Sequence, residues 1–306
     1  MMGIGVRLLE AVAPLMETIA PYLPGETFPF FFTIAMFQRA LLAAFVITIV
    51  AGVLGSFLLI RNMSLIGDGI AHVSFGGVAV ALVIGTAFTL EVAAVFAVVA
   101  AVLIFELQDR GILNGDTAIA IIMTGTLALG LVLLRLYGGG ITPMVGGFLY
   151  GNLLFIDDQS LDFIVTIGLV ALFALVVMYK GLLAAAVDPV AARVQGIPVK
   201  AIGLAFSVLT ALVVVSMVKI LGALLVTALL VSPAATGQQI GKSFRSCVLW
   251  SLLFGLLSVS LGIYYSAELS TGSGAMIALV AALVFAIVTI GKLFVNIVLN
   301  PEENFN

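Results

Sequence analysis

Charged residues are scarce in this sequence. Asp, Glu, Lys and Arg make up 9% of its 306 residues, whereas hydrophobic residues make up 63% and the mean hydropathy is +1.33. A soluble domain usually carries about 25% charged residues. So little charge cannot cover a surface that faces water, but a surface that faces lipid needs none. The composition therefore excludes an ordinary soluble protein and predicts a polytopic integral membrane protein.

Cysteine is almost missing as well, and basic charge is not in excess. The single cysteine, Cys247, excludes an intrachain disulfide and a cysteine cluster for a metal ion. The 12 Lys and Arg residues are outnumbered by 15 Asp and Glu residues, which gives a formal net charge of -3. No basic block could attract a polyanion, so we expect no nucleic-acid partner.

The first 30 residues lack the pattern of a secretory signal. They carry three glutamates and four prolines, and no basic region precedes an apolar core. Apolar residues recur at near-helical spacing between Gly5 and Ile19. This pattern predicts a short helix at the membrane interface, although a loosely ordered tail fits the sequence equally well. We treat residues 1–30 as a separate N-terminal segment.

Long apolar runs dominate the rest of the chain. A helix needs about 20 apolar residues to cross a hydrocarbon core of about 30 Å, and runs this long without alternation argue against barrel strands. The sequence predicts an all-α membrane protein with about nine spans, or eight, because the turn within 198–241 is weakly marked. The expected spans are 36–60, 64–85, 88–108, 115–137, 159–181, 198–218, 221–241, 245–267 and 274–297.

The basic residues indicate the orientation of the chain, because most of them fall in alternate loops between these spans. Such loops should face the cytoplasm. Nine spans then place the N-terminus outside and the C-terminus inside. We expect one transmembrane domain over residues 31–298 and a cytoplasmic tail over 299–306. The basic residues in these loops are Arg61, Arg110, Lys180, Arg193, Lys200, Lys242, Arg245 and Lys292.

Two connections are long. The outer loop, residues 138–158, is rich in glycine yet apolar and indicates a re-entrant or interfacial segment. The inner loop contains a short helix signal: Asp188 is a good N-cap, Pro189 a good first residue, and Gly196 a stop. This helix is too short to span a membrane, and it reads either as a linker or as a docking element on the cytoplasmic face.

The second expected span contains the most specific chemical feature. Asp68 and His72, the only histidine, are spaced i, i+4 and share one helix face. Counted along a continuous helix from Arg61, His72 would lie about 16 Å in, near the middle of the bilayer, where ionisable groups are rare and usually functional. A carboxylate with an imidazole suits a first-row divalent metal ion. A structural Asp–His hydrogen bond and a proton relay are the alternatives.

A proline interrupts the seventh expected span. Pro233 should kink its helix, and with Ser232 and Thr236 beside it the kink could form a gate or an oxygen-lined path, or be purely structural. The following GQQIGKS resembles a phosphate-binding loop but has three residues between the glycines instead of four, and no strand precedes it. We therefore expect no nucleotide site and no enzymatic activity in this chain.

Three segments together resemble one family. Residues Met63–Gly77 are similar to the SLMGDALSHAVLPGVA signature of the ABC-3 permeases of zinc, manganese and iron importers. Asp188–Val199 resembles the family's cytoplasmic DPxxARxxGIPV segment, and Gly222–Thr236 resembles its GxLLVxALLxxPAAT helix. The segments occur in the family's order, and the resemblance covers roughly residues 35–295. In the first segment Gly69-Ile70-Ala71 and Val73-Ser74-Phe75-Gly76 depart from the family pattern.

The resemblance implies a permease in the cytoplasmic membrane of a prokaryote that imports Zn, Mn or Fe. It implies a homodimer, a soluble ATPase subunit that binds ATP and docks from the cytoplasm, and an extracytoplasmic metal-binding protein. Asp68 and His72 match the family's intramembrane metal motif. The coupling helix matches Asp188, Pro189, Ala192, Arg193 and Gly196. No cofactor is expected in the chain itself.

Other classes of protein remain open at this point. An ABC permease for a metal chelate or cobalamin would need a wider path and gives no reason for the Asp68–His72 pair. A proton-coupled secondary transporter would use the pair as a relay and leaves the short inner helix without a purpose. An intramembrane enzyme fits least, because the chain has a single histidine and no recognisable pair of catalytic residues.

Overall fold

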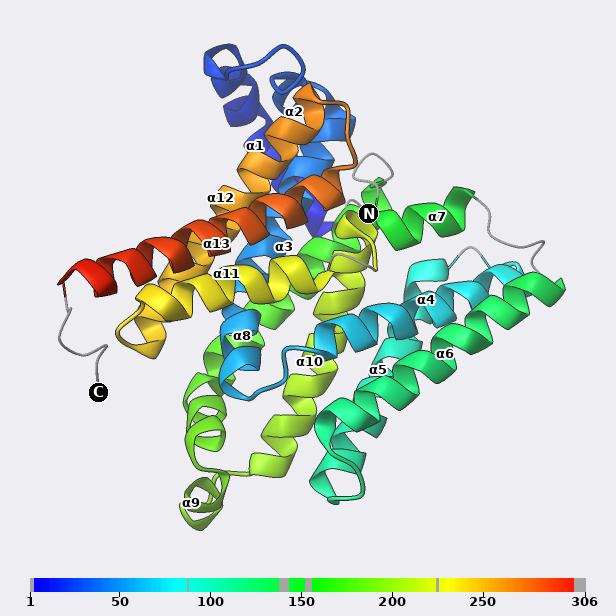
Figure 1. The fold of residues 1–306 in the computed structure, drawn as a ribbon. Coiled ribbons are helices and arrows are strands. Elements are labelled where there is room, and N and C mark those ends of the chain that lie inside the picture. Colours follow the sequence, from blue (N-terminus) through cyan, green and yellow to red (C-terminus); the bar gives the residue numbers. More distant parts are fainter. Residues whose placement is uncertain (1–2, 87, 138–142, 152–155, 224–225, 300–306) are drawn as a thin grey trace.

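The computed structural model describes residues 3–86, 88–137, 143–151, 156–223 and 226–299, and every regular element in these ranges is helical. An all-α fold is thereby confirmed (Figure 1). The helices are α1 (Ile4–Ile19), a 3-10 turn η1 (Ala20–Tyr22), α2 (Phe30–Thr33), α3 (Ala35–Ile60), α4 (Ile66–Ile84), α5 (Thr89–Asp109), α6 (Gly115–Tyr137), α7 (Pro143–Tyr150), α8 (Asp158–Val187), α9 (Pro189–Val194), α10 (Val199–Leu221), α11 (Val226–Ile240), α12 (Phe244–Glu268) and α13 (Ser273–Leu299).

Eight helices in the described ranges are long and apolar enough to cross a membrane: α3, α4, α5, α6, α8, α10, α12 and α13. The expected span 221–241 is the one that falls short. Residue 221 still belongs to α10, and Gly222, with φ +84°, ends that helix. The helix that follows, α11, has 15 residues, which extend about 22 Å instead of about 30 Å. In the described ranges, eight of the nine expected spans are therefore helices of spanning length, and the remaining one corresponds to the short helix α11.

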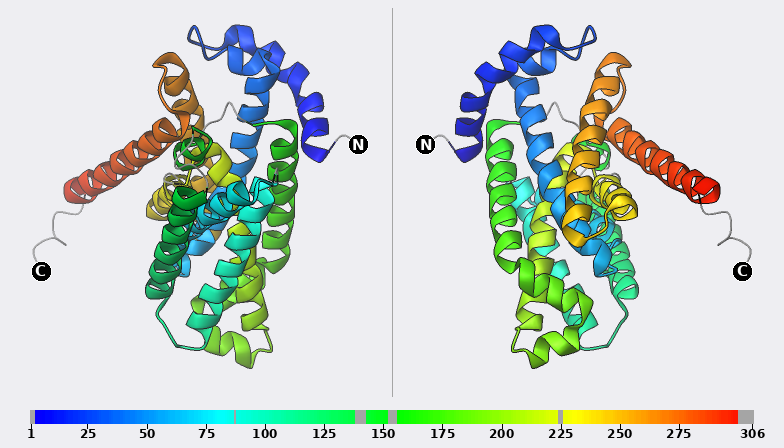
Figure 2. Two further views of the ribbon diagram at one scale, coloured as in Figure 1. Left: turned by 90° about the vertical axis from the view of Figure 1, so that its right-hand side faces the viewer. Right: turned by 90° about the vertical axis from the view of Figure 1, so that its left-hand side faces the viewer.

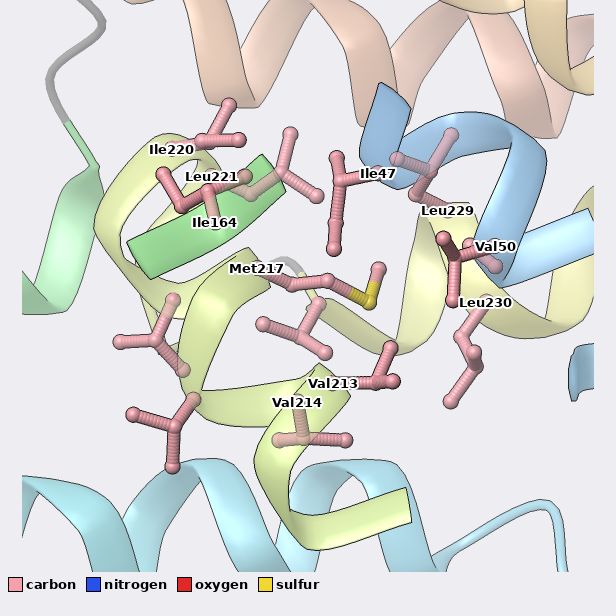
Figure 3. Packing of buried hydrophobic residues seen from close by; sticks show 14 of the residues in the cluster. Ile47, Val50, Ile164, Val213, Val214, Met217, Ile220, Leu221, Leu229 and Leu230 are labelled. Atoms are coloured by element: carbon pink, nitrogen blue, oxygen red, sulfur yellow. The ribbon is translucent and has the colours of Figure 1, made fainter. Parts of the chain in front are cut away.

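Three helices, α3, α4 and α10, form the centre of the molecule. In the most apolar stretch of α4, 72% of the residues are buried inside the protein, against 22% in α6 and in α13. Apolar residues of α10 fill the space between α3, α8 and α11 (Figure 3). Met217 of α10 lies there with Ile47 of α3, Ile164 of α8 and Leu230 of α11. The central helices thus pack mainly against protein, and the outer ones face the surroundings.

Glycine allows the closest of these helix contacts. A Cβ atom at Gly55 of α3 would collide with the backbone carbonyl oxygen of Leu230 in α11. At Gly77 of α4, a Cβ atom would lie 2.8 Å from the Cα atom of Ala93 in α5. Small residues let helix backbones approach in this way in membrane proteins, and here they bring α11 and α5 against the two central helices.

The N-terminal helix forms where the sequence predicted one, and it packs along the outer side of α8. The N–H of Val6 donates to Oδ1 of Asp162 at 3.0 Å, and Leu9 and Met16 join the main hydrophobic core. The interfacial position of this helix stays a prediction. Its contacts make it part of the folded protein.

The short inner helix also forms as predicted. Asp188 caps α9, because its Oδ1 accepts hydrogen bonds from the N–H groups of Val190 and Ala191, each at 2.9 Å. Gly196, with φ +79°, ends the segment. Figure 1 shows α9 and the turn between α5 and α6 at the end of the molecule opposite α1 and α2.

Candidate functional site

The Asp68–His72 pair lies at the start of α4, directly after a break in the chain. Helix α3 ends at Ile60, residues 61–65 form turns, and Asn62 has φ +53°. Asp68 therefore occupies the first turn of α4, where the positive end of the helix dipole favours a carboxylate. The depth counted from Arg61 along a continuous helix is wrong, because the intervening residues are not helical.

The two side chains face each other as the i, i+4 spacing predicted. Nε2 of His72 lies 3.7 Å from Oδ1 of Asp68, and the side chains are 15% and 38% exposed, respectively. This separation is too long for a hydrogen bond. Two atoms bound to one metal ion through bonds of about 2.1 Å lie at most about 4.2 Å apart, so a single ion can bridge the pair without rearrangement of the helix.

Two polar atoms, one in this pair and one beside it, are buried without a hydrogen-bond partner in the described part of the chain. They are Nδ1 of His72 and Oγ1 of Thr227, in the first turn of α11. A Cβ atom at Gly67 would lie 3.8 Å from Oγ1 of Thr227, which places this hydroxyl next to the residue that precedes Asp68. A buried polar atom without a partner is costly, so Thr227 is a candidate site residue that the sequence analysis did not select.

In the described part of the chain, ionisable side chains alone do not form a complete metal site. No group of three or more His, Cys, Asp or Glu side chains that could hold an ion occurs among the described residues. An ion between Asp68 and His72 would therefore need further ligands, such as oxygen or sulfur atoms, water, or groups of a second chain. The hydroxyl of Thr227 is an oxygen close to the start of α4, since a Cβ atom at Gly67 would lie 3.8 Å from it.

The proposed gate residues lie elsewhere on α11. Pro233 and Thr236 are buried, and Oγ1 of Thr236 donates to the carbonyl of Ser232 at 2.7 Å. A Cβ atom at Gly255 of α12 would lie 3.7 Å from Cβ of Pro233. Pro233 therefore faces α12, and the hydroxyl of Thr236 is bonded within α11 itself. Their role as a gate stays a prediction.

A cluster of charges joins α9 and α10 to the end of α5. Nζ of Lys200 lies 3.1 Å from Oε1 of Glu106 and 3.2 Å from Oδ2 of Asp109. Arg193 of α9 lies 3.8 Å from Oδ1 of Asp109, and Arg110 lies 2.9 Å from Oε2 of Glu106. This cluster could not be predicted from the sequence, because Glu106 and Lys200 are 94 positions apart.

Arg61 connects the turn between α3 and α4 to α10. Its guanidinium carbon lies 5.0 Å from the ring centre of Phe206, and its NH1 atom is buried without a hydrogen-bond partner in the ranges that the structure covers. Burial lowers the pKa of Arg61 from its usual value. The contact with the aromatic face compensates part of the lost hydration and fixes the turn that leads into Asp68.

The surface of α9 differs from that of an ordinary linker. Val190 and Val194, spaced i, i+4, are 70% and 84% exposed, whereas Ala192 is buried. An apolar face of this kind, raised on a capped helix at one end of the molecule (Figure 1), is a surface on which another protein can dock.

The described ranges hold eight apolar helices of spanning length and a partly buried Asp–His pair, which define a polytopic membrane protein. The sequence profile described as the ABC 3 transport family matches residues 33–292. The chain belongs to this family, as the resemblance predicted.

Individual relatives agree with this assignment. The "Manganese transport system membrane protein MntC" of Halalkalibacterium halodurans is 35% identical over 251 residues, 82% of this chain and 85% of that protein. The "Manganese import system permease protein ScaB" of Streptococcus parasanguinis is 34% identical over 250 residues, 82% of this chain and 88% of that protein. The "High-affinity zinc uptake system membrane protein ZnuB" of Haemophilus influenzae is 29% identical over 81% of this chain and 94% of that protein.

Solved structures share the fold. A chain of "PsaBC from Streptococcus pneumoniae in complex with Fab" superposes with a TM-score of 0.73 at 32% identity, covering 83% of this chain and 90% of that chain. A chain of "an inward-facing conformation of a putative metal-chelate type ABC transporter" has a TM-score of 0.69 at 17% identity, covering 92% of this chain and 97% of that chain. The second likeness concerns the fold alone.

Proposed function

We propose that this chain is the permease of an ATP-driven importer of a divalent transition metal ion, and that Asp68 and His72 bind the ion on its way through the membrane. The separation of 3.7 Å between Nε2 of His72 and Oδ1 of Asp68 carries this proposal, because it suits a bridging ion better than a hydrogen bond. The names of the relatives given above favour manganese or zinc over iron.

A site with few ligands suits transport. A structural zinc site uses four protein ligands and holds its ion permanently, whereas an ion in transit must leave again. Asp68, with a side chain that is 38% exposed, is accessible to an arriving ion, and His72 lies one turn further along α4. Thr227, on α11, would supply an oxygen ligand from the opposite side.

The importer would work as a homodimer with two kinds of partner. A soluble ATPase subunit would dock on the exposed Val190–Val194 face of α9 from the cytoplasm, and a metal-binding protein would deliver the ion on the other side of the membrane. Movement of α9 would pass through Arg193 and Lys200 to Asp109 and Glu106 at the end of α5. Since α5 packs closely on α4 at Gly77, the movement would reach the metal site.

The orientation with the N-terminus outside and the C-terminus inside is part of the proposal. The short helix α11 would complete the ninth passage within protein, because Ala223, shortly before it, lies beside α7 and its last turn lies beside α13. Ala223 N–H donates to the carbonyl of Phe148 at 3.0 Å, and Nζ of Lys292 donates to the carbonyl of Gln239 at 2.7 Å. The basic ends of α8, α12 and α13 would then face the cytoplasm.

Uptake into proteoliposomes tests the proposal. Vesicles would contain this chain with the ATPase and the binding protein encoded beside its gene, and would be offered Mn²⁺, Zn²⁺ and Fe²⁺ with and without ATP. We expect ATP-dependent uptake that falls about tenfold or more in His72→Ala and Asp68→Asn, since even changes around metal ligands cost 10- to 100-fold in affinity.

Other outcomes would point to the alternatives. Uptake driven by a proton gradient without ATP would identify a secondary transporter. Transport of a metal chelate but not of the free ion would identify a chelate permease. Normal ATP-driven uptake by Asp68→Asn at normal membrane abundance would refute the metal site and leave the pair with a structural role.

A further inference from the structure

A groove runs between α8 and α12 on the outside of the molecule. Both helices pack on α3, which forms the floor between them, and Figure 2 (right) shows α3 between these two helices. At one end the groove widens to a volume of about 530 Å³. Its lining residues are Val176, Val177, Tyr179 and Lys180 of α8 and Arg245 of α12.

The widened end is positively charged. Lys180 and Arg245 are exposed, and neither forms an ion pair or a side-chain hydrogen bond with any residue in the described ranges. Arg245 also lies in the first turn of α12, which Ser243 caps, so the positive end of the helix dipole adds to the two cations. None of the five residues that line this end is acidic.

Exposed apolar side chains adjoin this pocket on both helices. On α8 these are Phe173, Val176 and Val177, which are 73%, 73% and 67% exposed. On α12, Leu249 lies one turn after Arg245 and is 66% exposed. The later exposed leucines of α12 turn progressively away from Arg245, because a spacing of four residues advances about 40° around a helix at each step. An apolar surface about two turns long therefore adjoins the cationic pocket.

We propose that this groove is a binding site for an anionic phospholipid. The phosphate group would lie between Lys180 and Arg245, and the acyl chains would lie against Leu249 of α12 and against Phe173, Val176 and Val177 of α8. Basic pockets between membrane helices on the cytoplasmic side are suited to anionic headgroups. The choice of the cytoplasmic leaflet rests on the orientation given under the proposed function, but lipid binding itself depends neither on orientation nor on metal transport.

Native mass spectrometry of the purified full-length chain in detergent tests the site. Dioleoylphosphatidylglycerol would be titrated against dioleoylphosphatidylcholine, which has the same chains and a neutral headgroup. We expect preferential binding of the anionic lipid, reduced about fivefold by Arg245→Gln and roughly 25-fold by Lys180→Gln with Arg245→Gln, since each cation near an anionic lipid surface contributes about 1 kcal/mol.

Two further variants distinguish lipid binding in this groove from nonspecific attraction of anionic lipid to positive charge. Lys242→Gln removes a neighbouring exposed cation that does not line the groove, and it should leave binding unchanged. Val177→Trp keeps both cations but fills the groove, and it should weaken phosphatidylglycerol binding. Size-exclusion profiles and helix content identify variants that fold as the parent does, and comparisons are made among these.

Several results would overturn the proposal. Equal binding of the two lipids, or an equal loss in Lys242→Gln and Arg245→Gln, would exclude a specific anionic site. Displacement of the lipid by millimolar inorganic phosphate, with no effect of Val177→Trp, would indicate a plain anion site. Conversion of a dimer into a monomer by the Lys180 and Arg245 changes would show that a second copy of the chain occupies the groove.

Discussion

The carboxylate of Glu268, in the last turn of α12, accepts a hydrogen bond from the backbone N–H of Phe28 at 2.9 Å. The same carboxylate also accepts hydrogen bonds from the N–H groups of Glu26 and Thr27. The segment before α3 is thereby fixed to the turn between α12 and α13, and the ring of Phe28 packs on Tyr264 with centres 5.4 Å apart.

Replacement of this carboxylate should release the N-terminal segment. In Glu268→Ala three backbone donors lose their acceptor, so we expect faster hydrogen exchange at residues 26–28 while α12 keeps its protection. Exchange measured by mass spectrometry checks this, with Glu17→Ala, an exposed glutamate of α1, as the matched control. Unchanged protection at residues 26–28 would mean that the aromatic contacts alone hold the segment.

Asp68 and His72 should behave as one functional unit. If a single ion bridges them, the loss of either ligand removes most of the binding, and the double variant Asp68→Asn with His72→Gln should transport little worse than either single variant. Initial rates of metal uptake over a range of ion concentrations check this. Additive losses would show that the two side chains act at separate steps.

Thr227→Val distinguishes a ligand from a packing residue. The hydroxyl is buried without a partner among the described residues, so its removal should leave stability unchanged or raise it by about 1 kcal/mol. Metal uptake should fall nonetheless. Thr48→Val in α3 is the control, because that hydroxyl is buried too and donates to the carbonyl of Ala44 at 2.6 Å. Normal uptake by Thr227→Val would remove this residue from the site.

The charge cluster between α9 and α5 should be needed more for the coupling of ATP hydrolysis to transport than for folding. Exposed ion pairs contribute little to stability, so Asp109→Arg should fold normally but lower transport more than ATP hydrolysis. The reciprocal change Arg193→Asp in the same chain should restore part of the coupling. Ions transported per ATP hydrolysed, measured in proteoliposomes, give the answer. A parallel fall in both activities, without rescue, would contradict this role.

Gly55→Ala should destabilise the protein by about 1–3 kcal/mol, a typical effect of overpacking, because a Cβ atom there meets the carbonyl of Leu230. Gly125→Ala in α6 is the control. A Cβ atom at Gly125 meets nothing within 4 Å, and alanine favours a helix over glycine by about 1 kcal/mol. Thermal unfolding in detergent should shift in opposite directions for the two variants. Equal shifts would argue against close packing of α3 on α11.

The sequence predicts those features that depend on neighbouring residues. Long apolar runs locate the spanning helices, a capping aspartate and a stop glycine locate α9, and a spacing of four residues brings Asp68 to His72. The length of α11 could not be predicted, because the apolar run continues through Gly222 although the helix does not. Thr227 and the Glu106–Lys200 contact were missed because a single sequence contains no information on which distant residues meet.

The burial of α4 has a consequence for the way the protein responds to its membrane. The helix that carries Asp68 and His72 is enclosed by other helices and has little contact with lipid. A thicker or thinner bilayer could tilt the peripheral helix α13, which packs on α11 and α12, without acting directly on the surroundings of the pair. A tilt of α6 would reach them, because α6 packs on α4, where a Cβ atom at Gly69 would meet the side chain of Ile119. The proposed site would therefore sense the thickness of the host membrane through α6 rather than through α13.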